Sequence, residues 1–212
     1  TCAQVSLEYE VSEAEGEVRW RLCGPDGAEV LARAASLADG KRVLAGEVTG
    51  PRLWWPNGHG TPDLYRSTVE LLDGGGQVID RRESRVGFRR VRLVMNEGTW
   101  DEPGPDDFPK SRSHPPITLE VNGRRIFSKG SNWVCPDIVP GRVTPERYRA
   151  LLERARAAHL NLIRCWGGAI VPPEAFHDVC DELGLMVWQD FPLGCNRYEG
   201  TPEYLAVLDR ES

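Results

Sequence analysis

The fold of the second half of the chain is decided by residues 161–190, NLIRCWGGAIVPPEAFHDVCDELGLMVWQD. Apolar runs at 161–166 and 185–191 have the length and composition of short buried strands. Between them, Pro172-Pro173-Glu174 opens a helix, and Gly184 supplies its stop. The apolar residues of this helix share one face: Phe176, Val179, Cys180 and Leu183. Strands joined by a single helix run parallel, so the stretch predicts a β-α-β unit.

The residues around this unit extend the pattern in both directions. Upstream, 117–127 is a hairpin around an Asn122-Gly123 turn, followed by a strand that ends at 130–133. Thr144-Pro145-Glu146 opens a helix, with Thr as N-cap and Pro at the first helical position. Thr201-Pro202-Glu203 repeats that opening downstream. Residues 117–212 therefore predict the order β-α-β-α-β-α.

Two architectures fit that order, an open doubly wound sheet and a (β/α)8 TIM barrel. A dinucleotide-binding sheet needs a glycine-rich turn after its first strand, and this chain has none there. We therefore favour the barrel. Because a barrel takes ~250 residues, we expect 117–212 to be the N-terminal part of a barrel, truncated after about three of its eight units.

Residues 1–95 follow the period of two that is typical of strands. Val5, Leu7, Tyr9 and Val11 alternate with polar residues, and 17–23 repeat the pattern. Further strands are expected near 29–35, 41–48, 64–72, 77–82 and 83–90. About seven short strands predict an immunoglobulin-like β-sandwich over 1–95. Residues 96–116 are rich in proline and form a connector, whose Trp100 and Phe108 we expect to dock on a folded surface.

Composition narrows the class of protein. The net charge is −6, with 26 basic and 32 acidic residues mixed along the chain. No basic face points to nucleic acid, and no apolar run approaches the ~18 residues of a membrane span. The six cysteines have neither Cys-x-x-Cys nor zinc-site spacing, so we expect no metal and no cofactor. Cysteines within apolar runs suit buried free thiols, which favours a cytoplasmic location.

Candidate binding residues follow from where the three strands end. In parallel α/β folds, ligands bind at the carboxyl ends of the strands. These ends carry polar and aromatic side chains in alternation: Asn132, Trp133, Arg164, Trp166 and Asp190. An indole packs on the apolar face of a pyranose, and fixed donors and acceptors bind its hydroxyls. We therefore predict a sugar-binding hollow shared by Trp133, Trp166 and Asp190.

Structural roles compete with this prediction at several positions. Trp188 lies within a strand, so we expect it in the core rather than in the site. Arg164 is expected to form an ion pair, with Asp190 as the nearby carboxylate. Asp190 itself could equally serve as a helix cap or as an ion-pair partner. The four histidines are scattered along the chain, and none is assigned a role.

Six ordered segments resemble glycoside hydrolase family 2. They are WWPNGHG at 54–60, LY at 64–65, VGFR at 86–89, FSKGSNW at 127–133, NLIRCWGG at 161–168 and CDELGLMVWQDF at 180–191. The last two most resemble the β-mannosidase branch. The resemblance covers nearly the whole chain. It departs at Ala169, where the family usually has a third glycine, and at 171–173, where Val-Pro-Pro replaces Tyr-Glu.

The resemblance implies a retaining exo-glycosidase that removes terminal β-mannosyl residues. Such enzymes use two glutamates, which follow the fourth and seventh barrel strands. Both are expected beyond Ser212, so no catalytic residue is assigned and the segment alone is expected to be inactive. Trp166 is similar to the tryptophan that lines the family's non-reducing-sugar subsite. Asp190 resembles a carboxylate that accepts hydrogen bonds from sugar hydroxyls, with Asn132, Trp133 and Arg164 at the neighbouring strand ends.

Other functions stay open on the sequence. The chain could be a non-catalytic carbohydrate-binding or scaffold protein derived from such an enzyme. It could also belong to a β-glucosaminidase or β-galactosidase of the same family. Three βα units leave an open sheet edge and an uncovered apolar face, so self-association is expected.

Overall fold

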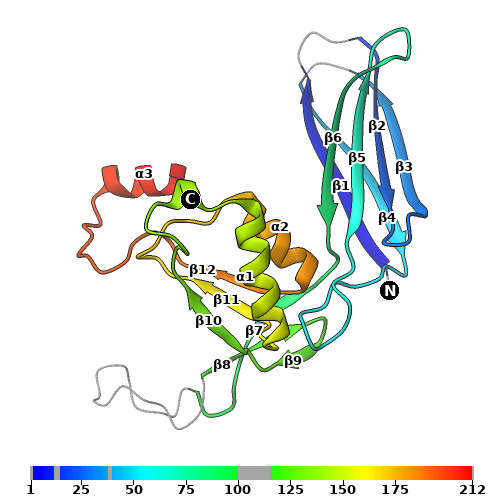
Figure 1. Cartoon of the computed structure of the whole chain (residues 1–212). Helices are drawn as coiled ribbons and strands as arrows, with labels where there is room; N and C mark the ends of the chain where they lie inside the picture. The colour runs from blue at the N-terminus through cyan, green and yellow to red at the C-terminus, as the bar shows by residue number, and fades with distance from the viewer. Residues whose placement is uncertain (1, 12–14, 38–39, 100–115, 212) are drawn as a thin grey trace. The chain divides into compact units, whose positions relative to one another are not determined.

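The computed structural model of the chain describes residues 2–11, 15–37, 40–99 and 116–211 (Figure 1). The chain divides into two compact units. The first consists of Thr1–Trp55, Thr61–Val91 and Val121–Gly123, and the second of Pro56–Gly60, Arg92–Glu120 and Arg124–Ser212. Most of the expected connector, including Trp100 and Phe108, lies outside the described residues.

Two antiparallel sheets make up the first unit. One pairs β1 (Cys2–Val11) with β4 (Gly40–Thr49). The other has the order β3-β2-β5-β6, with β3 at Glu29–Ser36, β2 at Glu17–Cys23, β5 at Tyr65–Leu72 and β6 at Val78–Val86. Its core draws on strands of both sheets: Trp20, Leu22, Leu31, Val48 and Tyr65. The predicted β-sandwich is therefore confirmed.

Strand β6 differs from its prediction. The two strands expected at 77–82 and 83–90 are one continuous strand that pairs with β5 from Val86 back to Val78. The charged run Asp80–Glu83 interrupts the apolar alternation where the two strands were expected to meet. Backbone pairing along β5 continues through that run, because ladder hydrogen bonds do not depend on side-chain polarity.

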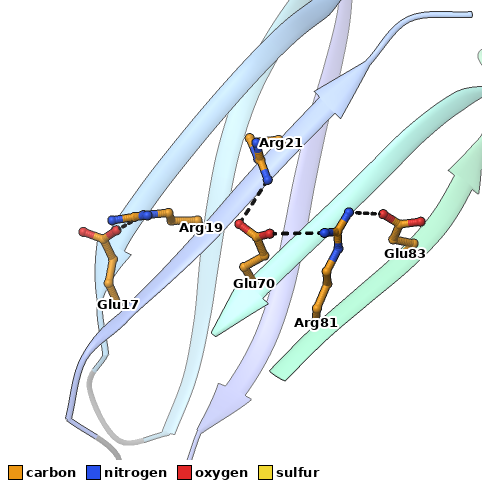
Figure 2. A network of polar contacts seen from close by, with 6 residues as sticks. All are labelled: Glu17, Arg19, Arg21, Glu70, Arg81 and Glu83. Atoms are coloured by element: carbon orange, nitrogen blue, oxygen red, sulfur yellow. Dashed lines mark hydrogen bonds and ion pairs between the residues drawn. The ribbon is translucent and has the colours of Figure 1, made fainter. Parts of the chain in front are cut away.

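Ion pairs link three strands on the solvent face of this sheet (Figure 2). Glu70 on β5 lies between Arg21 of β2, at 3.1 Å, and Arg81 of β6, at 3.7 Å. Arg81 also binds Glu83, and that contact lowers the pKa of the Glu83 carboxyl. Because the Arg21 and Arg81 side chains are about half exposed, solvent screens these pairs, and they support register rather than carry the stability of the sheet.

A three-stranded sheet of order β7-β8-β9 contains the predicted hairpin. Its strands are β7 (Val91–Met95), β8 (Ile117–Val121) and β9 (Arg124–Ile126). Asn122 and Gly123 have φ values of 51° and 81°. Positive φ at both central residues is the requirement of a type I′ turn, so the Asn-Gly prediction is confirmed.

Three parallel strands carry the rest of the second unit: β10 (Gly130–Trp133), β11 (Leu162–Cys165) and β12 (Met186–Gln189). Helices α1 (Pro145–Ala157) and α2 (Glu174–Leu183) connect them, and α3 (Pro202–Glu211) follows. A 3-10 turn, η1, covers Pro140–Arg142. The parallel direction, the Thr144 N-cap and the Gly184 stop are all as predicted.

The register of these strands assigns each side chain to a face. Trp133 and Cys165 lie in one row, and Asn132, Arg164 and Trp188 form the next. The row of Cys165 faces the core that α1 and α2 build, with Leu152, Phe176 and Leu183 as buried members. Because successive side chains alternate, the row of Arg164 points to the opposite face. This second face is where the candidate site lies.

Two buried or partly buried amides fix the ends of these elements. Asn161, fully buried before β11, donates to the Phe127 carbonyl and accepts from the Lys129 amide. Asn57 donates from Nδ2 to the carbonyl of Arg156, in the last turn of α1, at 3.0 Å, and to that of Leu160, just after the helix, at 2.8 Å. Its backbone N–H binds the carbonyl of Gly184, which ends α2. One residue thus satisfies the terminal carbonyls of two helices.

The described parts of the chain contain no helix that is both long and apolar enough to cross a bilayer. All six cysteines are free. Cys165 and Cys180 are buried, and burial raises the pKa of the Cys165 thiol to about 11 and that of Cys180 further. Cys2 and Cys195 are exposed.

We expect Asn57→Ala to lower the free energy of unfolding by about 1–3 kcal/mol, because the carbonyls of Arg156 and Leu160 lose the Nδ2 donor. Asn57→Asp, which keeps the size but replaces the Nδ2 donor by an oxygen, should cost at least as much. Urea denaturation monitored by far-UV circular dichroism measures both. Gln77→Ala, at an exposed position between β5 and β6, is the control; equal stability of all three variants would contradict the role of Asn57.

The four thiols that are either exposed or fully buried should divide into two classes when the native protein meets iodoacetamide near about pH 8. Cys2 and Cys195 should be alkylated first, whereas Cys165 and Cys180 should react only after unfolding, since they are buried and protonated. Peptide mass spectrometry reports each site, and labelling in guanidinium chloride sets the full value. Native labelling of Cys180 at the rate of Cys195 would show that this core opens readily.

Candidate functional site

A cleft of about 440 Å³ opens at the carboxyl ends of β11 and β12. Its lining includes Arg164, Trp166, Gly167, Trp188, Asp190 and Phe191. Three of the five predicted site residues, Arg164, Trp166 and Asp190, therefore line one hollow.

The Arg164 guanidinium holds the polar side of the cleft together. Nη2 binds Asp190 Oδ2 at 2.6 Å, and Nη1 binds Asn132 Oδ1 at 3.2 Å. The ion pair that the sequence predicted between Arg164 and Asp190 is thus present. Asn132 does not line the cleft, but it orients Arg164 from the neighbouring strand. A charge-assisted contact between half-buried groups fixes Asp190 more firmly than a solvent-exposed pair would.

The Asp190 carboxylate also organises the backbone of the turn after β11. Its Oδ2 accepts from the Gly167 N–H at 3.2 Å, and the Asp190 N–H donates to the Cys165 carbonyl at 3.1 Å. The Gly194 N–H donates to the Gly167 carbonyl at 3.1 Å. These hydrogen bonds join the segment after β12 to the turn after β11. Since both side-chain contacts of Asp190 use Oδ2, its Oδ1 can accept a hydrogen bond from a ligand hydroxyl.

Trp188 corrects one prediction from the sequence. It was expected in the core, but 53% of its surface is exposed and it lines the cleft beside Trp166. The Arg164 guanidinium lies 5.8 Å from the centre of its ring. Trp188 shares the row of Asn132 and Arg164, which points away from α1 and α2. The period of two within β12 separates Trp188 from Val187, but only the packing of Val187 against the helices shows which of the two faces the cleft.

Trp133 lies elsewhere. Its ring packs on Phe176 at 4.9 Å and on Tyr148 at 6.2 Å between ring centres, on the helix side of the sheet. It lines a second, mainly apolar cleft of about 360 Å³ with Cys135, Val143 and Pro172. The hollow around Trp166 and Asp190 is therefore formed without Trp133.

The lining of the first cleft suits a polar ligand that has one apolar face. Two indoles supply flat apolar surface, and a fixed carboxylate supplies an acceptor. Arg164 and Asp190 are the charged side chains among its described lining residues, and they neutralise each other. No group of three or more potential metal-ligating side chains occurs within the described ranges.

The family profile described as "Glycosyl hydrolases family 2" matches residues 2–89. Over 99% of its length, the chain is 34% identical to β-mannosidase B of Aspergillus flavus, of which it covers 24%. The chain belongs to glycosyl hydrolase family 2. This chain spans about a quarter of the length of two Aspergillus β-mannosidases that it matches.

Solved structures agree with the family assignment. The β-D-mannosidase of Dictyoglomus thermophilum superposes with a TM-score of 0.79 at 32% identity, over 99% of this chain and 25% of that one. Bacteroides uniformis β-glucuronidase 3 superposes at 0.76 with 23% identity, over 99% and 23%. At that identity the second likeness concerns the fold alone. The relatives of this chain at higher identity are β-mannosidases.

Replacing Arg164 by methionine should lower the free energy of unfolding by about 1–2 kcal/mol, since the half-buried Asp190 loses its partner. Asp190→Asn should cost a similar amount, and the double variant should cost less than the sum. Chemical denaturation of the four proteins gives the coupling free energy. Arg142→Met, in an exposed pair with Asp137 at 3.9 Å, is the control. Strict additivity would mean that the Arg164–Asp190 contact contributes nothing.

Proposed function

We propose that this chain forms the subsite for the terminal, non-reducing sugar in a β-mannosidase-like retaining exo-glycosidase. The observation that carries the proposal is the Asp190 carboxylate, fixed through Oδ2 by Arg164 and the Gly167 N–H beside two indole rings. An acceptor held in place costs little entropy when a sugar hydroxyl binds it. The identity to β-mannosidases over the whole chain supports mannose as the sugar.

Charge favours a neutral sugar over the charged sugars of other family members. Within the described lining of the cleft, the one guanidinium is already paired with the one carboxylate. A uronate would need a free cation, and an ammonium sugar would need a free anion. Asp190 already neutralises the Arg164 charge at 2.6 Å, so neither charged sugar meets an uncompensated opposite charge in the cleft.

The catalytic step needs more than this cleft supplies. Retaining hydrolysis uses two carboxyl groups about 5 Å apart, one as nucleophile and one as acid/base. Asp190 is the single carboxylate among the described lining residues, and Arg164 occupies it. The share of this chain in the reaction is therefore to bind and orient the sugar, with both catalytic carboxylates supplied by other residues.

The same proposal assigns the domains. The sandwich is an immunoglobulin-like domain, and β10-α1-β11-α2-β12 is the start of a (β/α)8 barrel. The parallel register and the cleft at the carboxyl ends of the strands support this assignment. A crystal structure of the protein tests it: a further parallel strand beside β10 or β12 would agree, whereas an antiparallel one would contradict it.

Binding of methyl β-mannoside tests the function. We expect saturable binding, weakened about tenfold or more by Trp166→Ala or Asp190→Ala through loss of stacking or of a fixed acceptor. Isothermal titration calorimetry gives the dissociation constants. Phe127→Ala removes an aromatic ring that is 81% exposed and outside the cleft, so it should bind as tightly as wild type.

Two results would overturn the proposal. One is equal or tighter binding of methyl β-glucuronide or methyl β-glucosaminide by the wild-type chain. The other is steady hydrolysis of 4-nitrophenyl β-mannoside by the purified chain, since that would require a carboxylate pair that the cleft does not contain.

A further inference from the structure

The turn Trp166-Gly167-Gly168 contains two glycines whose backbone conformation does not require glycine. Neither has a φ in the left-handed region. Any L-residue could adopt their backbone angles. The reason for glycine at both positions must therefore be space rather than conformation.

Space is limited at the two positions by different neighbours. A Cβ on Gly167 would lie 2.3 Å from the carbonyl oxygen of Phe191, which is backbone. A Cβ on Gly168 would lie 2.4, 2.5 and 2.7 Å from Cη2, Cζ2 and Cζ3 of Trp166. The six-membered ring of Trp166 thus folds back over the Cα of its own turn, and Gly168 is the surface on which it rests.

We propose that Gly168 is a positioning residue, which sets the orientation of the Trp166 indole in the cleft. This inference rests on the proposed function, because the indole face is taken to stack on the sugar. With hydrogen at position 168, the ring lies against the backbone. With a methyl group there, the ring must swing away, since atoms cannot approach within 3 Å of a Cβ.

The two glycines should respond differently to a methyl group. At Gly167 the obstacle is the backbone of the segment that carries Asp190, so Gly167→Ala must separate two hydrogen-bonded segments. At Gly168 the obstacle is the edge of a side chain that can rotate about two bonds. Gly168→Ala should therefore displace the ring while the fold persists. A purely structural glycine would show the opposite, a loss of stability with the ring in place.

The experiment compares Gly168→Ala with Gly200→Ala, in which the added methyl group meets no atom within 4 Å and φ is not positive. The indole N–H signals are recorded by ¹⁵N NMR without sugar, and Trp166→Ala assigns the signal of Trp166. We expect the Trp166 signal to shift in Gly168→Ala and to stay in Gly200→Ala. The unfolding midpoints of both should lie within about 4 °C of wild type.

Sugar binding is the second measurement. Gly168→Ala should weaken methyl β-mannoside binding about tenfold, whereas in the Trp166→Ala background the same substitution should have no further effect. This non-additivity is the signature of a residue that acts through Trp166.

The two proposals can fail separately. If wild type does not bind methyl β-mannoside, the proposed function fails, while the indole shift still reports on Gly168. If the Trp166 signal is unchanged in Gly168→Ala, or if Gly168→Ala weakens binding equally with and without Trp166, the positioning role is overturned.

Discussion

The cleft depends on the parallel register of β10, β11 and β12. That register places Asn132, Arg164 and Trp188 side by side, on the face away from α1 and α2. Only in this arrangement can the Arg164 guanidinium reach both Asn132 on β10 and Asp190, which follows β12. A slip of one residue in a single strand would turn its row toward the helices and separate the three groups.

The register is itself supported by side-chain amides that bond to backbone groups. Asn161 is fully buried, and its amide replaces two backbone partners at the entry to β10. Asn57 plays a comparable part at the ends of α1 and α2. A buried amide without partners is costly, so these contacts favour one arrangement of strands and helices over its near alternatives.

The cleft has a polar side, where Asp190 is held rigidly, and an aromatic side, where the Trp166 ring folds back over its own turn. Arg164 and Gly167 hold Asp190 from two directions, and backbone hydrogen bonds from Asp190 and Gly194 tie the segment after β12 to the end of β11 and its turn. Trp166 rests on Gly168 and faces the same space. Rigid walls of this kind suit a small polar ligand, because few degrees of freedom are lost when it binds.

The sequence by itself determined the order of elements in 117–212, the parallel direction of the strands there, the N-cap of α1, the stop of α2, and the proximity of Arg164 to Asp190. These follow from local signals: a helix between two strands, Thr-Pro and Gly at helix ends, and opposite charges at neighbouring strand ends. The sequence did not predict that β6 is one continuous strand, because its charged run interrupts the apolar alternation while the backbone pairing continues.

Only the tertiary structure decided which tryptophans face the cleft. Trp133 and Trp188 both occupy strands, and their composition does not distinguish them. Trp133 lies in the row of Cys165 and packs against the helices, whereas Trp188 lies in the row of Arg164 and faces the opening. Side-chain direction is set by register against neighbouring strands, and that register is a property of the assembled sheet rather than of any one segment.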